Sequence, residues 1–366
     1  MNAAERPPLD PDRLRTPALV IDLATARRNI AATLAEAAST ARWRPHVKTA
    51  KVPEVMALYL EAGLRRFKCA TLREAEELMR CGGSALAPED ILVAHHLHGP
   101  ALEALADVAA RFPTCRWSTL VESSEQVERV PNSVDVFIDV DLGMNRTGLD
   151  VARLDDAVEI ARRAGPRFRG LHAYDGHRHE ADRVERESLA HAGYRRVLNA
   201  ASVLEAAGAP AREVITCGTP AYPAGLSFQD WNVGSHSISP GTVVYHDLRS
   251  QSQLAPREVE FAATVWTRVA SLPSDDLFTV DAGSKAIEAA SPNMIARIIE
   301  LPGARALRQS EEHTVFQIDK GERPARGTLL RLVPGHVCPT VNLASRCVLT
   351  EEDRFLGEVA VTARGH

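Results

Sequence analysis

Hydrophobic and polar positions divide the chain into two parts with different periodicity. Between residues 43 and 238, short apolar and β-branched runs alternate with segments whose apolar residues recur at helical spacing. The runs predict eight strands, at residues 43–48, 66–70, 91–95, 116–121, 134–141, 169–174, 214–217 and 231–238. The segments predict helices at residues 53–62, 72–81, 100–111, 124–130, 151–163 and 180–207, and the same spacing predicts a helix at residues 24–40, before the first of these strands.

Eight strands that alternate with helices predict an α/β fold of the (β/α)8 TIM-barrel type. A doubly wound open sheet is the alternative. The regular count of eight, together with the lack of a Gly-x-Gly-x-x-Gly motif after the first strand, favours the barrel.

Beyond residue 250 the helical spacing disappears, and short β-branched runs are divided by Pro, Gly and Asp. They predict strands at residues 258–269, 277–282, 314–318, 327–333, 340–343 and 355–362, with no clear helix among them. We therefore predict a barrel domain over residues 16–250 and a mainly antiparallel β-domain over residues 251–366. The β-rich run at residues 16–23 is a further candidate strand of the β-domain.

The composition is that of a packed globular protein, with 45% hydrophobic and 25% charged residues in a chain of 366. A net charge of −5 and a pI near 6.2 argue against a nucleic-acid partner, which usually needs a basic face. No apolar run is long enough to predict a membrane span, and residues 1–12 lack the apolar core of a signal peptide. The six cysteines have no framework spacing, so we expect reduced thiols in a cytoplasmic protein.

A basic run over residues 44–51 contains the first candidate for chemistry, Lys48. Short basic runs are often solvated surface patches. Lys48, however, lies where the first predicted strand meets a loop, and barrels of this type carry their active sites at that end of the strands. A lysine enclosed there loses hydration, which favours the neutral, nucleophilic amine. The expected electrophile is the aldehyde of pyridoxal 5′-phosphate.

Other predicted strands end in further candidates. Arg146 lies in a glycine-bounded loop after the fifth strand, Tyr174 ends the sixth, and His177 lies shortly after it. The loops after the seventh and eighth strands often bind phosphate in such barrels. Here they offer backbone N–H groups without bulky side chains, and hydroxyls, from Gly218, Thr219, Gly241 and Thr242. Each of these motifs alone is more often an ordinary turn.

His336 and Cys338 form a candidate metal site. On an extended segment, residues two apart point the same way, so both side chains could meet one ion. Imidazole and thiolate together favour Zn²⁺. The alternative is a buried cysteine beside a histidine that caps a loop. Two protein ligands are fewer than the three usual at catalytic zinc, so solvent, substrate or a third residue such as His177 would complete the shell.

Four motifs together resemble a known family. Residues 44–51 (RPHVKTAK) resemble the lysine motif of the fold-type III pyridoxal-phosphate enzymes. Residues 140–148 (VDLGMNRTG) and 239–247 (SPGTVVYHD) resemble the arginine loop and the phosphate loop of alanine racemases and their relatives. Residues 335–343 (GHVCPTVNL) resemble the metal motif of the branch that contains eukaryotic-type D-serine dehydratases and D-threonine aldolases.

The resemblance implies roles for individual residues. Lys48 would form the Schiff base with the cofactor, Arg146 would pair with the cofactor's phenolic oxygen, and Tyr174 would lie near its pyridine nitrogen. The four phosphate-loop candidates would hold the phosphate, and His336 and Cys338 would bind a divalent metal. Members of the family are typically dimers with sites between barrel and β-domain, so a homodimer is expected.

Three positions depart from the family pattern. Ala50 stands where the branch usually has a histidine, which implies a changed native substrate. Ser239 stands where alanine racemases have an arginine, so the electronic environment that this arginine provides in a racemase is not reproduced. Ser237 stands where aldolases of the branch often have a glutamate.

The resemblance implies a lyase that acts on a small D-3-hydroxy amino acid. Aldolases of the branch tend to carry an aspartate at the position of Cys338, and dehydratases a cysteine. A thiolate suits zinc, whereas a carboxylate suits Mn²⁺ or Mg²⁺. We therefore expect a dehydratase for a substrate such as D-serine or 3-hydroxyaspartate, with His177 as a candidate acid or base. Retro-aldol cleavage is the alternative, followed by an amino-acid racemase or a non-catalytic pyridoxal-phosphate carrier.

Overall fold

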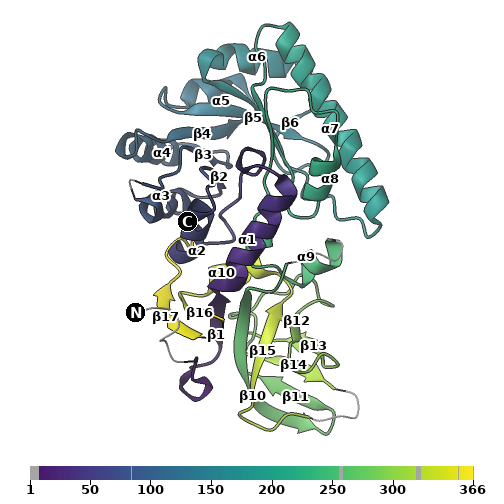
Figure 1. Cartoon of the computed structure of the whole chain (residues 1–366). Helices are drawn as coiled ribbons and strands as arrows, with labels where there is room; N and C mark the ends of the chain where they lie inside the picture. The colour runs from purple at the N-terminus through teal and green to yellow at the C-terminus, as the bar shows by residue number, and fades with distance from the viewer. Residues whose placement is uncertain (1–7, 84, 255–258, 319–322, 353, 366) are drawn as a thin grey trace. The chain divides into compact units, whose positions relative to one another are not determined.

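A computed structural model describes residues 8–83, 85–254, 259–318, 323–352 and 354–365 (Figure 1). The chain forms two units. One, here called the β-unit, comprises Met1–Ala32, Thr49–Leu58 and Thr242–Gly365. The other, the parallel-sheet unit, comprises Thr33–Lys48 and Tyr59–Gly241. Helices α1 (Leu23–Ala37) and α2 (Pro53–Glu61) contribute residues to both units.

Parallel strands form the frame of the parallel-sheet unit. They have the order β2–β3–β4–β5–β7–β8–β9, and the short strand β6 pairs with β5. The bounds are β2 (Arg66–Cys69), β3 (Asp90–Val93), β4 (Arg116–Val121), β5 (Asp135–Asp141), β6 (Leu149–Asp150), β7 (Phe168–Ala173), β8 (Glu213–Thr216) and β9 (His236–Ile238). Each pair of neighbours is parallel, which confirms the predicted α/β class.

Helices accompany these strands and are arranged around them in Figure 1. They are α3 (Leu72–Gly82), α4 (Pro100–Arg111), α5 (Ser124–Arg129), α6 (Leu154–Ala164), α7 (Arg183–Ala206) and α8 (Tyr222–Ser227). Because the helices cover the sheet, strand β3 is buried at every position. A core cluster of Leu92, Leu120, Phe137 and Ile215 lies between four different strands. The periodicity missed α8, since Pro223 and Gly225 give it the composition of a turn.

The first predicted strand, at residues 43–48, is not a regular strand. Two isolated parallel bridges join Trp43 to Ile238 of β9 and His46 to Lys68 of β2. The segment 43–46 thus pairs with both edge strands of the parallel sheet. Lys48 lies in the turn that follows the second bridge.

The β-unit is built on a nine-stranded sheet of order β13–β14–β11–β10–β1–β16–β17, with β15 beside β10 and β12 beside β15. Its strands are β1 (Ala18–Asp22), β10 (Ala263–Ser274), β11 (Leu277–Val280), β12 (Ala296–Ile298), β13 (Arg305–Gln309), β14 (Thr314–Gln317), β15 (Leu329–Pro334), β16 (Arg346–Glu351) and β17 (Arg354–Ala360). β1 is antiparallel to β10 and parallel to β16. The other pairs are antiparallel, as predicted for this part of the chain.

The prediction of a strand at residues 340–343 was wrong, as was the expectation of no helix beyond residue 250. Residues Val337–Leu343 form helix α10, and α9 spans Leu248–Gln253. The β-branched Thr340 and Val341 suggested a strand, but Pro339 lies in the first helical turn, where a missing N–H costs nothing. The Thr340 hydroxyl donates to the carbonyl of His336 at 2.8 Å. The first residue of the predicted strand 258–269 lies outside the described residues.

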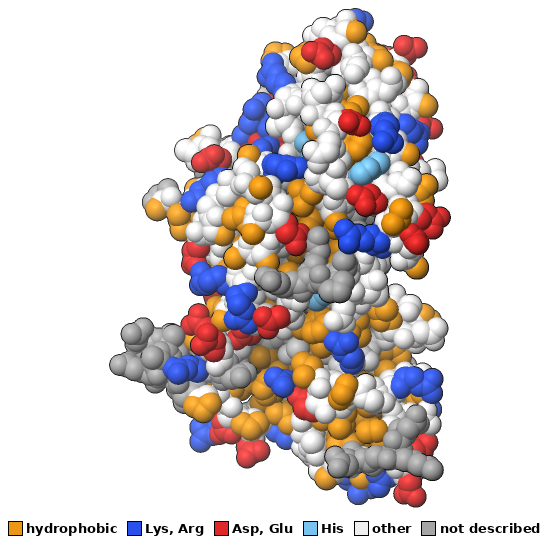
Figure 2. Space-filling model, turned by 45° about the vertical axis from the view of Figure 1, so that its right-hand side comes forward, with side chains coloured by type: hydrophobic (Ala, Val, Ile, Leu, Met, Phe, Trp, Pro, Cys, Tyr) orange, Lys and Arg blue, Asp and Glu red, His pale blue; other side chains and the backbone are white. Residues whose placement is uncertain are grey.

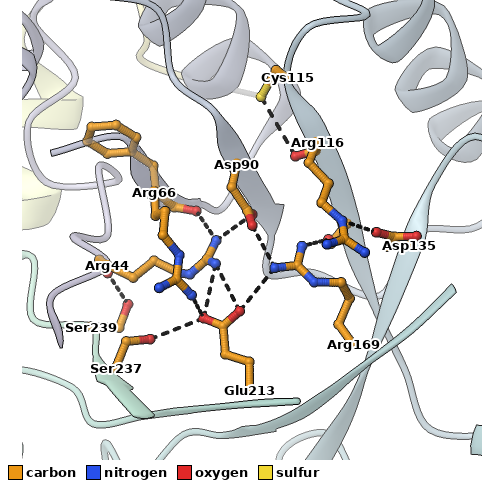
Figure 3. A network of polar contacts seen from close by, with 12 residues as sticks. Arg44, Arg66, Asp90, Cys115, Arg116, Asp135, Arg169, Glu213, Ser237 and Ser239 are labelled. Atoms are coloured by element: carbon orange, nitrogen blue, oxygen red, sulfur yellow. Dashed lines mark hydrogen bonds and ion pairs between the residues drawn. The ribbon is translucent and has the colours of Figure 1, made fainter. Parts of the chain in front are cut away.

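Five charged side chains, four of them buried and Arg66 partly exposed, form a network at the amino-terminal ends of the parallel strands (Figure 3). Arg44 donates to Asp90 at 2.7 Å and to Glu213 at 3.0 Å, and Arg169 donates to Asp90 at 2.6 Å and to Glu213 at 3.0 Å. Arg66 forms a third ion pair with Glu213. The arginines hold the pKa of the Asp90 carboxyl well below its usual range, against the effect of its burial. The network occupies the end of the sheet opposite to the candidate site.

On the face drawn in Figure 2, Lys and Arg side chains are interspersed with Asp and Glu. Among the described residues, no helix is both long and apolar enough to cross a membrane. The six cysteines all lie within the described residues, and none of them forms a disulfide.

Candidate functional site

Lys48 lies partly exposed at the carboxyl end of the parallel strands, and its amine faces the ring of Tyr174. The distance from Lys48 Nζ to the ring centroid is 6.0 Å. Tyr174 directly follows strand β7. Within the described part of the chain, the Lys48 amine makes neither a hydrogen bond nor an ion pair. It is therefore available to an incoming electrophile.

The Tyr174 ring is held between two glycines and faces three cationic side chains. A Cβ atom on Gly176 would lie 2.2 Å from the Tyr174 hydroxyl, and one on Gly218 would lie 3.0 Å from the ring. The Arg146 guanidinium carbon lies 4.8 Å from the ring centroid. Lys68 Nζ lies 5.5 Å from it. The structure thus brings together Lys48, Arg146 and Tyr174, which the sequence placed after three different strands.

The first turn of the loop that carries Arg146 is shaped by the carboxylate of Asp141. Asp141, the last residue of β5, accepts hydrogen bonds from the backbone N–H groups of three successive residues, 143–145, at 2.8–3.2 Å. Gly148 closes the loop with φ +105°, and a Cβ there would lie 2.9 Å from the Asp141 nitrogen. Only glycine fits that position, so the glycines are needed for the path of the loop.

The phosphate-loop candidates differ in their contacts. The N–H of Gly218, expected to serve a phosphate, donates to Asp175 at 3.0 Å in this structure. Gly241 passes so close to the chain before Lys48 that a Cβ would lie 2.3 Å from the His46 carbonyl oxygen. Thr219 is buried in the same unit, and Thr242 belongs to the β-unit.

The sequence did not single out three polar residues beside Tyr174, namely Lys68, His172 and Asp139. Lys68 is a buried residue of β2, and its amine lies 3.2 Å from His172 Nε2. His172 Nδ1 lies 2.7 Å from Asp139 Oδ1. The register of β5 and β7 pairs Asp139 directly with His172, which no pattern in the sequence reveals.

His177 has the features of a side chain whose partner is a ligand. Both of its ring nitrogens are shielded from solvent, and neither has a hydrogen-bond partner in the described residues. Partial burial lowers its pKa, and the neighbouring Arg178 lowers it further. A neutral imidazole with two unused nitrogens can accept or donate a proton.

In the β-unit, His336 is oriented by a buried carboxylate. Its Nδ1 lies 2.9 Å from Oδ2 of Asp247, which is fully buried and also accepts the N–H of Val337 at 2.9 Å. Although burial opposes ionisation, these hydrogen bonds lower the pKa of Asp247. An ionised Asp247 requires a proton on Nδ1, which leaves the lone pair of Nε2 for a metal ion.

Cys338 is the second residue of α10, so the predicted extended geometry of the His-x-Cys segment was wrong. His336 is the N-cap and is itself extended, with φ −136°. The Cys338 sulfur lies 3.1 Å from the Thr49 hydroxyl and 3.3 Å from the Thr242 hydroxyl. These hydroxyls can donate to a thiolate. Among the described residues, no group of three or more His, Cys, Asp or Glu side chains is arranged to hold a metal.

These arrangements fit the two groups that the resemblance implies. An amine without a hydrogen-bond partner suits an aldehyde, and Arg146, which has no acidic partner among the described residues, suits an anionic group. An imidazole with a fixed tautomer and a thiol with hydroxyl donors suit a divalent metal of the zinc type.

Comparisons with known proteins agree with this chemistry. The family profile "Alanine racemase, N-terminal domain" matches residues 21–248, and a profile for a serine dehydratase domain matches residues 262–350. A D-threonine aldolase from Arthrobacter sp. is 29% identical over 98% of this chain and 96% of its own length. A D-threo-3-hydroxyaspartate dehydratase from Delftia sp. is 27% identical over 89% and 92%. The crystal structure of D-threonine aldolase from Filomicrobium marinum has a TM-score of 0.87, with 27% identity and 98% coverage of both chains.

Proposed function

The chain belongs to the family of the alanine racemase N-terminal domain, within the fold-type III pyridoxal-phosphate enzymes, and we propose that it is a lyase acting on D-3-hydroxy amino acids. The observation that carries this proposal is the Lys48 amine, which faces Tyr174 without a hydrogen-bond partner in the described residues. Relatives that are aldolases and dehydratases of hydroxy amino acids support the substrate class.

We assign the cofactor site to residues at the carboxyl ends of the parallel strands. Pyridoxal 5′-phosphate, when bound, supplies an aldehyde and an electron-withdrawing ring that stabilises negative charge at the substrate's Cα. Lys48 would hold it covalently, Arg146 would contact its phenolic oxygen, and Tyr174 would contact its pyridine ring. The phosphate would be held by Gly218, Thr219, Gly241 and Thr242. The N–H of Gly218 donates to Asp175 in this structure, so that hydrogen bond would have to break before the N–H could bind the phosphate.

We assign the metal site to His336 through Nε2 and Cys338 through Sγ. A bound divalent ion supplies a Lewis acid for the substrate's β-hydroxyl. Asp247 holds the ligating tautomer of His336, and the hydroxyls of Thr49 and Thr242 stabilise negative charge on the sulfur of Cys338. The soft thiolate favours Zn²⁺ over Mn²⁺ or Mg²⁺.

The chain's own residues then move two protons in a dehydratase. The substrate's amino group first displaces Lys48. The amine of Lys48 is then free, and its Nζ accepts the proton from the substrate's Cα. The β-hydroxyl leaves, with His177 as the candidate donor of the proton that converts it to water. The enamine that remains is released and hydrolysed by one water molecule to a 2-oxo acid and ammonia. We favour this route because Cys338 supplies a thiolate in place of a carboxylate.

The second candidate is an aldolase, which the similarity to the two D-threonine aldolases favours. In this route His177 would accept the proton of the β-hydroxyl, and the Cα–Cβ bond would break to give glycine and an aldehyde. The two routes use the same residues and differ in which proton is removed first.

We further infer that the parallel sheet closes into a (β/α)8 barrel, because residues 43–46 bridge both edge strands. A cytoplasmic homodimer is our proposal for the assembled enzyme, from the typical state of the family. Gel filtration with light scattering tests the dimer, for which a mass near twice 39.8 kDa is expected.

Product analysis tests the proposed function. The full-length protein is incubated with pyridoxal phosphate, Zn²⁺ or Mn²⁺, and D- and L-forms of serine, threonine and 3-hydroxyaspartate. A 2-oxo acid with ammonia from a D-isomer is expected. Glycine with an aldehyde would establish the aldolase instead. No product from any of these substrates, in a protein that binds the cofactor, would contradict the lyase. Cys338→Ala is expected to abolish turnover while the cofactor stays bound.

A further inference from the structure

Lys68 is a buried amine beside the candidate cofactor site that the proposed mechanism does not use. It is 2% exposed, although lysine is almost never fully buried without a partner. Its Nζ lies 3.2 Å from His172 Nε2 and 5.5 Å from the centroid of the Tyr174 ring, the same ring that Lys48 faces. No carboxylate pairs directly with it, so its one close polar partner among the described residues is an imidazole.

The hydrogen bonds fix the direction of this contact. Asp139 is ionised, because hydrogen bonds from His172 and His96 lower the pKa of its carboxyl despite burial. His172 is neutral, because burial and the charge of Lys68 lower its pKa. The single ring proton of His172 therefore lies on Nδ1 and is donated to Asp139. Its Nε2 accepts a hydrogen bond from the Lys68 amine.

Burial first, and then the charge of Lys48, lower the pKa of Lys68 to about 7. Asp139 and Asp175 oppose this shift, as does the thiol of Cys217. His46, from the segment between the edge strands, also faces Lys68, and burial keeps its pKa well below the usual value. Among the described residues, these groups, together with His172 and Tyr174, are the titratable side chains that surround the amine.

The hydrogen-bonded chain continues from Asp139 toward solvent. Asp139 Oδ2 lies 3.0 Å from His96 Nε2, and the hydrogen bond and charge of Asp139 outweigh burial and raise the pKa of His96. The His96 side chain is 11% exposed, and its Nε2 lies 3.8 Å from Glu122, which is 39% exposed. Lys68, His172, Asp139 and His96 thus form a continuous hydrogen-bonded line from a buried amine to an imidazole that is partly exposed to solvent.

We propose that Lys68 is a second proton-exchanging amine of this site and that the line through His172 and Asp139 to His96 connects it to solvent. A proton passes from Lys68 Nζ to His172 Nε2 as the Nδ1 proton of His172 passes to Asp139. Asp139 regains its charge when that proton passes to the unprotonated Nε2 of a neutral His96, and the resulting imidazolium releases one proton to solvent. Lys68 ends neutral and one proton leaves the site, so the transfer is balanced.

The purpose of this exchange rests on the proposed function. Lys48 becomes an ammonium group when it accepts the Cα proton, and a second ammonium beside the same ring is then unfavourable. Release of the Lys68 proton along the line keeps the local charge constant. Lys68 touches no reacting atom in this account and acts through the charge that it places beside Lys48.

Lysine NMR tests the ionisation of Lys68 directly, because the chain contains only five lysines. In protein labelled with ¹³C at lysine Cε, one signal is expected to titrate with a midpoint near pH 7 in the cofactor-free full-length chain, and to be absent from Lys68→Arg. Asp139→Asn removes a carboxylate that favours the ammonium form, so it is expected to move that midpoint lower. A Lys68 signal that titrates only above pH 9 would overturn the proposal.

Turnover of the holoenzyme tests the function of the exchange. Lys68→Met and Lys68→Arg are both expected to lower kcat by at least tenfold and to abolish the limb of the kcat profile near pH 7, since arginine does not release its proton. The exposed Lys285→Arg is the matched control. A kcat in Lys68→Arg equal to that of the wild type would show that a permanent positive charge at this position is sufficient, and it would overturn proton exchange. An inactive wild-type enzyme with a normal NMR midpoint would refute the proposed function alone. If Lys68→Arg does not fold, the NMR signal is assigned by elimination with variants of the other lysines.

Discussion

The Nδ1 atom of His336 lies 2.9 Å from a carboxylate oxygen of Asp247, and the two residues are 89 positions apart in the chain. Asp247 is fully buried and has no role of its own at the surface. Its contribution is to hold the imidazole in the tautomer that carries its proton on Nδ1 and its lone pair on Nε2. The candidate metal site therefore depends on a residue outside the His-x-Cys motif.

Asp247→Asn is expected to weaken Zn²⁺ binding by roughly 10- to 100-fold, because an amide no longer enforces the ligating tautomer. Titration against a chromophoric chelator measures this in cofactor-free protein. Asp182→Asn is the matched control, since Asp182 caps helix α7 as Asp247 caps α9. Equal zinc affinity in all three proteins would show that Asp247 does not orient a metal ligand.

Glu213 holds three arginines at the opposite end of the parallel strands (Figure 3). Glu213→Gln leaves these buried cations with Asp90 as their single carboxylate in the network. We expect a loss of about 3–5 kcal/mol in stability, the usual cost of breaking a buried ion pair. Urea unfolding of the cofactor-free protein measures it. Glu125→Gln, which breaks the exposed pair with Arg129, is expected to cost less than about 1 kcal/mol, and similar losses in both variants would contradict this account.

Gly241 passes the carbonyl of His46 at a distance that admits no side chain. Gly241→Ala would place a methyl group 2.3 Å from that oxygen, so the segment leading to Lys48 must shift. We expect the affinity for pyridoxal phosphate to fall at least tenfold, as measured by fluorescence titration. Gly303→Ala, where a Cβ meets nothing within 4 Å, is the control. Wild-type affinity in Gly241→Ala would remove the loop from the proposed cofactor site.

The low pKa of Lys68 makes stability depend on pH. Between about pH 7 and pH 10.5 the unfolded chain binds the lysine proton and the folded chain does not, so this contribution to stability rises with pH and is lost as pH falls to 7. Lys68→Met removes it. The stability of Lys68→Met relative to wild type is therefore expected to be greater at pH 6 than at pH 9, by on the order of 2 kcal/mol. Urea midpoints at the two pH values measure this, with Lys285→Met as the exposed control. A pH-independent difference would contradict the assigned ionisation.

The sequence predicted those parts of the site that follow a strand. Lys48 and Tyr174 end predicted strands and Arg146 lies in the loop after another, and the carboxyl ends of parallel strands meet at one edge, so the pattern alone brings them together. Lys68, Asp139 and His172 lie inside strands, where an isolated polar residue looks like an outward-facing one. Their contact depends on strand register, which periodicity does not fix.

Tertiary contacts also decide which distant residues become neighbours and whether a segment forms a helix or a strand. Arg44 and Glu213 are separated by 169 positions, and they become neighbours because the segment at residues 43–46 lies beside the parallel strands. Helix α10 was predicted as a strand because its β-branched residues outweighed the weak signal of a first-turn proline. In both cases tertiary contacts decided the outcome over local preference.

Borohydride reduction tests the central claim most directly, because two lysines face the Tyr174 ring and only one is proposed to hold the cofactor. The protein is loaded with pyridoxal phosphate, reduced with sodium borohydride, digested and mapped by mass spectrometry. We expect the reduced pyridoxyl group on Lys48, with Lys68 unmodified, and no stoichiometric labelling in Lys48→Ala. Modification of Lys68 in the wild-type protein, or labelling of neither lysine, would contradict the assignment of Lys48 and the proposed function that rests on it.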